Sequence, residues 1–270
     1  MLNKSVVTLP PMTLGWLITN VLWLSLALLA ASALTNRRSL SGAGWFLFGA
    51  HWLKQPSHYM VIGDYFNVVL TLVAALFSFY MAWIILARGC DSPSCDWASS
   101  AVAIGGILYF PFSQIPLLGG WLVGQTANLT ATILVTFGVP VLFNGASSMS
   151  LNDHSVQIIL ACTAIESMAL FTGVILSVRA PALRKFAALM ISVPVIYVLN
   201  LFRNVFVVLA YGNEWFGPDS FYMAHNVVAK VGSTIAMFII AYGVLMLLPE
   251  MLDAIDELSR VIKRTRGDVV

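Results

Sequence analysis

Charged side chains are scarce in this sequence: only 10% of its 270 residues are charged, whereas 59% are hydrophobic. A soluble globular domain carries about 25% charged residues. With so few charges and a mean hydropathy of +0.87, the chain cannot cover a water-exposed surface, so lipid must solvate much of it. The formal net charge is +2 and no basic stretch is interleaved with aromatic residues, which argues against a nucleic-acid partner.

Cysteine and metal-ligand patterns are sparse as well. The chain has three cysteines and four histidines. Cys90 and Cys95 have the spacing C-x4-C in "CDSPSC", which is wrong for a zinc knuckle, and no histidine lies nearby. His51, His58 and His154 are not spaced as ligands of one ion. We therefore expect no metal and no cofactor.

Apolar runs between polar or turn-forming breaks predict about eight membrane spans, at residues 14–34, 41–60, 64–87, 98–112, 119–142, 164–180, 182–210 and 223–248. The second run contains "KQPSH" and could be a half-span or an interfacial helix. No repeat, low-complexity segment or long linker divides the chain. Because an open sheet cannot satisfy its main chain in lipid, the sequence predicts an all-α polytopic membrane protein, with about eight transmembrane helices in a single domain over residues 1–270.

Basic residues near the span ends predict the orientation. One group lies between the sixth and seventh spans and another follows the last span, and we expect both to be cytoplasmic: Arg179, Arg184, Lys185, Arg260, Lys263, Arg264 and Arg266. The opposite ends, 144–160 and 211–222, contain no Lys or Arg and belong outside. The C-terminal stretch 249–270 is expected to form an amphipathic helix at the inner face of the cell membrane.

The first half of the chain fits this orientation less well. Counting back through eight spans puts the N-terminus inside and places Arg37, Arg38 and "CDSPSC" outside. An outside position for Arg37 and Arg38 violates the positive-inside rule. Either the second span does not cross, or this half of the chain follows the rule poorly. Outside the cell, Cys90 and Cys95 could form a disulfide, and the sequence leaves this open.

Three reactive or charged residues fall at one membrane depth in this topology. Cys162 lies where the outer loop enters the sixth span, Arg203 lies near the outer end of the seventh, and His225 opens the eighth. They are 41 and 22 residues apart, but three adjacent antiparallel helices could bring them into one pocket. A charge within a span costs about 2.5–3.5 kcal/mol and usually faces a polar cavity. Asn200 lies three residues before Arg203 on the same helical face, which favours such a cavity.

Each of these residues has a simpler interpretation when it is taken alone. Cys162 could be a small packed side chain, Arg203 could extend to the outer headgroups, and His225 could lie at the interface. A helix N-terminus or a neighbouring cation favours a thiolate, however, and the thiolate is the reactive form. The turn around His225 is also polar, with Asn226 beside it and Lys230 five residues further on.

Two motifs around these residues resemble a known family. "ACTAIES" at 161–167 and "NLFRN" at 200–204 resemble the exosortase/archaeosortase family of membrane transpeptidases, and "GWFLFGAHWL" and "GDYFNVVLTLVAAL" in residues 44–76 resemble its archaeosortase A branch. The resemblance covers most of residues 40–248. It implies a Cys–Arg–His/Arg active site that sorts secreted proteins whose C-terminal tail has a Pro-Gly-Phe-type motif, an apolar helix and basic residues. The resemblance also implies that the tail is removed and that the new C-terminus is joined to a membrane lipid.

Carried over to this sequence, the resemblance implies that Cys162 is the nucleophile, which forms an acyl thioester. Arg203 would stabilise the oxyanion or the substrate, and His225 would be the general acid and base, although archaeosortase A relatives can have arginine at this helix start. Glu166 could pair with Arg203 or cap its own helix. Supporting roles are also expected for three amides, Asn200, Asn204 and Asn226. The implied partners are secreted substrates and a lipid acceptor, met at the outer face of the cell membrane, and the oligomeric state stays open.

Two other functions compete with a transpeptidase. A transporter or anion-binding membrane protein would use Arg203 and His225 to hold a substrate. The sequence shows no inverted repeat and no paired broken helices, which argues against that alternative. In an assembly or chaperone subunit of a secretion system, Cys162 would be structural only. Replacing Cys162 separates these functions, because only the transpeptidase depends on its thiol.

Overall fold

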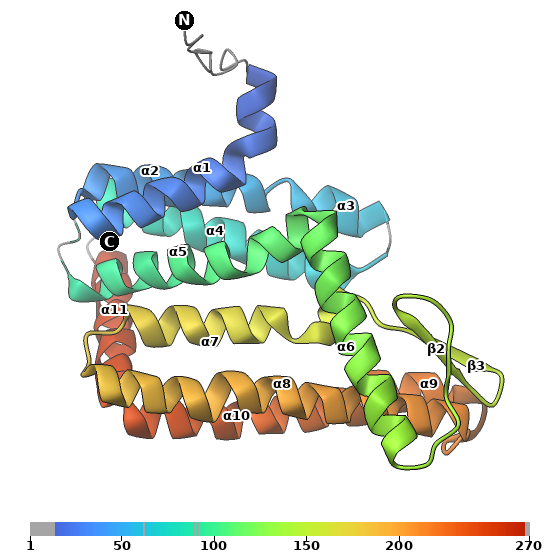
Figure 1. Ribbon diagram of the computed structural model, residues 1–270. Helices are drawn as coiled ribbons and strands as arrows, with labels where there is room; N and C mark the ends of the chain where they lie inside the picture. Colours follow the sequence, from blue (N-terminus) through green and yellow to red (C-terminus); the bar gives the residue numbers. More distant parts are fainter. Residues whose placement is uncertain (1–13, 62, 89, 91, 268–270) are drawn as a thin grey trace, which may run out of the picture. The chain divides into compact units, whose positions relative to one another are not determined.

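The computed structural model describes residues 14–61, 63–88, 90 and 92–267. Within this range it describes the burial of side chains between residues 20 and 263. Helices dominate it (Figure 1). The chain forms two compact units, Met1–Asp91 and Ser92–Val270. No linker in the sequence marks the boundary between them.

The first unit contains α1 (Leu14–Thr35), α2 (Arg38–Trp52), α3 (Gln55–Val61) and α4 (Tyr65–Ala87). Glycines bring α2 close to both α1 and α4. A Cβ atom on Gly44 would lie 2.8 Å from the Leu29 side chain of α1, and a Cβ on Gly42 would lie 2.3 Å from Leu86 of α4. Small residues at such contacts let membrane helices approach closely.

The second unit is built on four helices that run in alternating directions: α5 (Pro93–Gln114), α7 (Ile165–Ser177), α8 (Ala182–Gly212) and α10 (Ala229–Leu247) (Figure 1). A Cβ on Gly173 of α7 would lie 2.5 Å from the carbonyl oxygen of Ala101 in α5. Only glycine allows this main-chain approach. On its other side α7 contacts α8, which in turn contacts α10. The candidate site is built where the last three of these helices meet.

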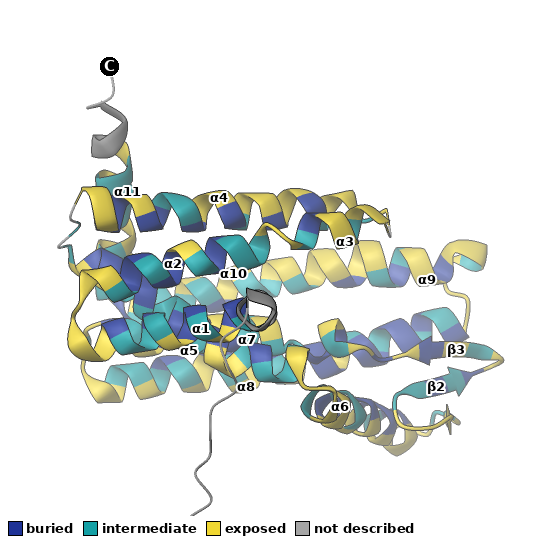
Figure 2. Cartoon of the chain, turned by 90° about the horizontal axis from the view of Figure 1, so that it is seen from above, coloured by how far each residue is buried: buried dark blue, intermediate teal, exposed yellow. Residues whose placement is uncertain are grey.

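Among the described residues, three helical stretches are long and apolar enough to cross a membrane: Tyr65–Ala87, Ala182–Gly212 and Gly217–Leu247. α5 and α6 (Pro116–Thr136), which meet at an angle of 90°, count as a fourth only if the bent pair forms one span. Each of the eight predicted spans overlaps a helix, but the expected count of about eight transmembrane helices is not confirmed. Only 17% of the most apolar window in Gly217–Leu247 is buried, so this span exposes an apolar face, visible along α10 in Figure 2.

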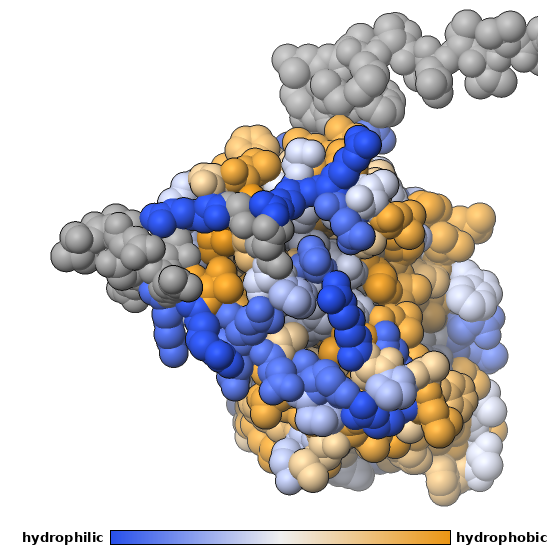
Figure 3. Space-filling view, turned by 90° about the vertical axis from the view of Figure 1, so that its left-hand side faces the viewer, coloured by the Kyte–Doolittle hydropathy of each residue, from blue (hydrophilic) through white to orange (hydrophobic). Residues whose placement is uncertain are grey.

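Basic residues of the second unit gather at one end of its helices, where α11 (Pro249–Gly267) lies and hydrophilic residues cover the surface (Figure 3). Arg184 of α8 donates a hydrogen bond of 3.1 Å to Glu250, which lowers the pKa of this carboxyl below its ordinary value. Arg179 lies 3.8 Å from Asp96 of α5. The expectation that "CDSPSC" and Arg179 lie on opposite sides of the membrane is therefore wrong. The expected count treated α5 and α6 as two crossings, whereas the two helices meet at 90°.

The start of α5 lies at the same end of the second unit as Arg179. Cys90 and Cys95 are disulfide-bonded, which leaves Cys162 as the free cysteine.

A small antiparallel sheet follows α6, which the all-α prediction did not include. Its strands are β1 (Leu142–Phe143), β2 (Ser148–Leu151) and β3 (His154–Gln157), paired in that order. Asn152 and Asp153 form the tight turn between β2 and β3, with φ of 49° and 66°. Met149 and Leu151 are buried in a cluster with α6 and α8. The sheet lies at the end of the second unit opposite α11 (Figure 1), in the stretch without Lys or Arg.

Candidate active site

Cys162 lies in a tight turn that precedes α7. It belongs to the 3₁₀ helix η1 (Leu160–Thr163), and its N–H donates to Ile159 O at 2.8 Å. Ala164 then adopts a left-handed conformation, with φ of 58°, before α7 begins. A non-glycine residue in this region is uncommon and points to a turn fixed by its surroundings. Cys162 is buried, with 9% of the residue exposed.

Two amides of α8 hold this turn. Asn200 Nδ2 donates to the carbonyl oxygen of Cys162 at 2.6 Å, and Asn204 Nδ2 donates to the same oxygen at 3.0 Å. Both asparagines are buried, so these hydrogen bonds offset the cost of removing the amides from water. Asn200 and Asn204, for which the sequence predicted supporting roles, therefore hold the main chain of Cys162 by its carbonyl oxygen and do not bond its thiol.

Arg203 lies between these asparagines in sequence and shares their helical face. Its Nη2 lies 3.3 Å from His225 Nε2. Because a guanidinium only donates, Nε2 must accept, which leaves the ring proton on Nδ1 to donate to Asn226 Oδ1 at 3.3 Å. Arg203 therefore points toward His225 and not toward the lipid headgroups, which was the alternative interpretation of its sequence.

His225 is held by an unusual stretch of helix. After η2 (Gly217–Asp219) and α9 (Ser220–Tyr222), the chain forms a π-helix, η3 (Met223–Val228), that leads into α10. Such π-helical turns occur often at functional sites. The Phe221 ring stacks on the His225 ring, with a centroid distance of 5.3 Å and an interplanar angle of 8°. Phe221 lies four residues before His225, a spacing that could have indicated this contact from the sequence.

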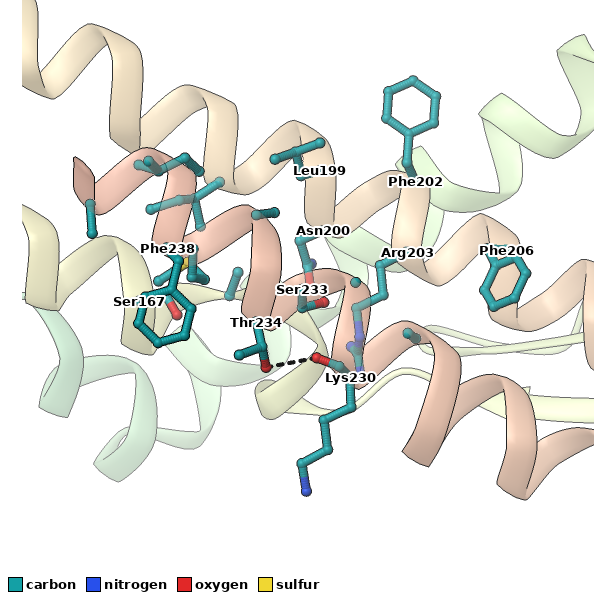
Figure 4. Close-up of a pocket in the computed structure, with 18 of the residues that line it drawn as sticks. Ser167, Leu199, Asn200, Phe202, Arg203, Phe206, Lys230, Ser233, Thr234 and Phe238 are labelled. Atoms are coloured by element: carbon teal, nitrogen blue, oxygen red, sulfur yellow. Dashed lines mark hydrogen bonds between the residues drawn. The ribbon is translucent and has the colours of Figure 1, made fainter. Parts of the chain in front are cut away.

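The structure therefore connects the three residues that the sequence singled out. The Cys162 carbonyl is bonded to the α8 face that carries Arg203, and Arg203 contacts His225. A cavity of about 800 Å³ lies between α7, α8 and α10, and of the three residues Arg203 is the one in its lining. Asn200, Arg203 and Lys230 are among its polar lining, while most of the rest is apolar. In Figure 4, Asn200 and Arg203 point from α8 toward α10, and the Lys230 side chain extends away from them.

Glu166 has a different partner from the one considered in the sequence. Its Oε1 accepts a hydrogen bond of 3.1 Å from the Tyr109 hydroxyl of α5, and no ion pair with Arg203 is present among the described side chains. It lies in the first turn of α7 without capping it. No sequence signal pointed to Tyr109. His154 lies in the sheet, 3.2 Å from Glu214, and no cluster of three or more His, Cys, Asp or Glu in the described part of the chain is placed to hold a metal ion.

The long apolar helices and this intramembrane polar cluster define a membrane protein. The chain belongs to the transmembrane exosortase family, whose sequence pattern matches residues 3–247. It is similar to archaeosortase A of Natronomonas pharaonis, with 29% identity over 259 positions that cover 83% of this chain and 80% of the relative. It is also 29% identical to archaeosortase A of Haloferax volcanii over 290 positions, which cover 92% of this chain and 94% of the relative. No solved structure matches the chain.

Proposed function

We propose that this protein is a membrane-embedded cysteine transpeptidase that removes the C-terminal sorting signal of secreted surface proteins. One observation carries this proposal: two asparagines tie the turn of Cys162 to the α8 face bearing Arg203, which contacts His225. Arg203 lines the cavity, and so do Ala161 and Ala164 on either side of the Cys162 turn, which supports a site with a nucleophile, an oxyanion donor and a general base. The two relatives named archaeosortase A support the same function.

In this mechanism, the sulfur of Cys162 attacks a peptide carbonyl of the substrate tail. The thiol proton passes to His225 Nε2, a C–S bond forms and, when the C–N bond breaks, His225 returns the proton to the leaving amine. Arg203 stabilises the oxyanion. Its contact with Nε2 at 3.3 Å occupies the lone pair that must accept the proton, so a turn of Arg203 toward the oxyanion releases the base as the substrate enters.

The thioester is then resolved by a lipid. A hydroxyl or amine of a lipid headgroup attacks the acyl carbon, its proton passes to His225, and the Cys162 thiolate leaves. The substrate class follows from the family resemblance: a short Pro-Gly-Phe-type motif, an apolar helix and a basic end. The apolar lining of the cavity suits a reaction that joins a membrane-anchored chain to a lipid acceptor.

Removal of this protein from cells is expected to leave such secreted proteins with intact C-terminal tails. Mass spectrometry of their C-terminal peptides, compared between cells with and without the protein, tests the proposal. A reporter whose tail lacks the apolar helix serves as the control, because it should stay uncut in both strains. Equal trimming of the natural substrates in both strains would contradict the proposed function.

We further expect Cys162 to face the extracytoplasmic side, since the sheet end of the unit lacks Lys and Arg. A membrane-impermeant thiol reagent should then label intact cells at this residue alone, because Cys90 and Cys95 are disulfide-bonded. That disulfide lies toward the basic end of the unit. If this end faces the cytosol, the reducing conditions there would disfavour the disulfide. The labelling therefore decides which end of the unit, the sheet end or the basic end, faces the outside. The variant Cys162→Ser provides the unlabelled control. Labelling that requires lysis would reverse the orientation.

A further inference from the structure

The outer strand of the small sheet has an open edge. The N–H of Ile158 donates to Ser147 O at 2.8 Å. In the antiparallel β2–β3 pair, this bond determines which residues of β3 turn their N–H and C=O groups toward β2 and which turn them away. Residues 154, 156 and 158 point their main-chain groups toward β2, so the N–H and C=O groups of Ser155 and Gln157 point away from it. β3 is the last strand of the sheet in the described part of the chain.

The side chains of this segment alternate in the same regular way. Val156 and Ile158 are buried, at 7% and 3% exposed, in the cluster that contains Cys162. Ser155, Gln157 and Ile159 are exposed. None of these three is charged or a proline, although lysine and proline are the usual protection of an exposed edge. The edge is thus suited to pair with another extended chain.

The edge also leads directly to the candidate nucleophile. Extended backbone continues beyond β3 to Ile159, with φ of −116° and ψ of 173°. The carbonyl of Ile159 then accepts the hydrogen bond from Cys162 N at 2.8 Å. A chain paired along residues 155–159 would thus end beside the turn that begins three residues before Cys162.

The sheet is fixed to the helix that carries the other candidate residues. Asn152 Nδ2 donates to Gly212 O, at the end of α8, at 3.0 Å. His154 lies 3.2 Å from Glu214 and packs edge-on against Tyr211 of α8, with ring centroids 4.6 Å apart. The open edge is therefore fixed to α8, the same helix that carries Arg203.

We propose that the open edge of residues 155–159 binds the extended segment of the substrate around its scissile bond as an added strand, which delivers the scissile carbonyl to Cys162. The inference rests on the proposed function and names the surface that recognises its substrate. An extended peptide offers N–H and C=O groups with the repeat that this edge requires. A membrane-spanning helix has already used these groups within itself, and a lipid has no such repeat.

Proline substitution tests the edge directly. In Gln157→Pro the lost N–H is one that faces the open edge, so the β2–β3 ladder should survive. We expect substrate trimming to fall about tenfold or more, with unchanged protein level and unchanged alkylation of Cys162. Phe143→Pro is the matched control. Because Asn144 N donates to Ser148 O, the Phe143 N–H faces the outer edge of β1, which is the opposite edge of the sheet from β3. This variant should trim normally.

Cross-linking provides a second measurement that does not depend on the proline variant folding. In a Cys162→Ser background, a cysteine introduced by Gln157→Cys should form disulfides with single cysteines placed along the substrate motif. An added strand predicts bonding at alternate motif positions, because side chains of a strand alternate between its faces. Bonding without alternation, or none at all, would overturn the edge proposal, and so would normal trimming by Gln157→Pro. If Cys162→Ser itself trims substrate, the proposed function has failed instead.

Discussion

Cells in which Cys162 is replaced by serine are expected to keep this protein in their membranes and to accumulate untrimmed substrate. The substitution is nearly isosteric, and it should cost about 1–2 kcal/mol of stability if the buried hydroxyl lacks a partner. The turn should persist, because Asn200 and Asn204 bond the main-chain carbonyl rather than the sulfur. Trimming should fall by at least about a thousandfold, as when a nucleophile is removed from other hydrolases.

The loss follows from the chemistry of the oxygen nucleophile. A serine hydroxyl is scarcely ionised, and a base suited to a thiol is too weak to remove its proton. Two blots from one culture make the measurement, one for the protein in membranes and one for the size of a substrate. Normal protein with normal trimming would leave Cys162 as packing only, which is what a transporter or an assembly subunit predicts. Loss of the protein itself would show that the thiol is needed for folding.

The sequence predicted the helices and the trio of candidate residues because both depend on local, one-dimensional signals. Apolar runs locate helices wherever lipid is the solvent. The charge asymmetry predicted that Cys162, Arg203 and His225 lie at one end of their helices. In the structure Asn200 and Asn204 of α8 bond the Cys162 carbonyl, and Arg203 of α8 contacts His225. A polar residue in an apolar helix carries enough cost to be informative by itself.

The bend between α5 and α6 lay beyond such signals. An apolar run has the same composition whether its helix crosses the membrane or lies at an angle to its neighbour. Pro116 at the first position of α6 marks a helix start, but a start does not fix an angle. The 90° bend therefore changed which side holds the "CDSPSC" segment without changing any predicted helix.

Partners across the fold were the other part that the sequence could not supply. Asn200 and Asn204 are four residues apart, which predicts one polar face but not that both bind a single carbonyl. Glu166 was expected to pair with Arg203 or to cap its own helix, and the structure pairs it with Tyr109, 57 residues earlier in the chain. The sheet was missed because its strands are only two to four residues long, too short for a clear alternation.

Replacing Arg203 by lysine is expected to reduce trimming by about ten- to a hundredfold although the charge is kept. Arginine presents five donors on a planar fork, whereas the lysine ammonium is a compact, mobile point charge. In this structure one arm of the fork, Nη2, contacts His225 Nε2 at 3.3 Å, and in the proposed mechanism the guanidinium turns from this ring to the oxyanion. A lysine ammonium cannot hold the oxyanion in the geometry of the planar fork, and losing one oxyanion donor costs about a hundredfold or more in other enzymes.

The control for this substitution is Arg179→Lys, at a side chain 77% exposed that pairs with Asp96 at the basic end of the unit. An exposed pair of this kind contributes about 0–1 kcal/mol, so Arg179→Lys should trim substrate at the normal rate. Trimming is followed in time for both variants, at matched protein levels and with the alkylation rate of Cys162 recorded to report on the turn. Near-normal trimming by Arg203→Lys would mean that only the positive charge matters, and Arg203 would then attract the substrate rather than stabilise its oxyanion.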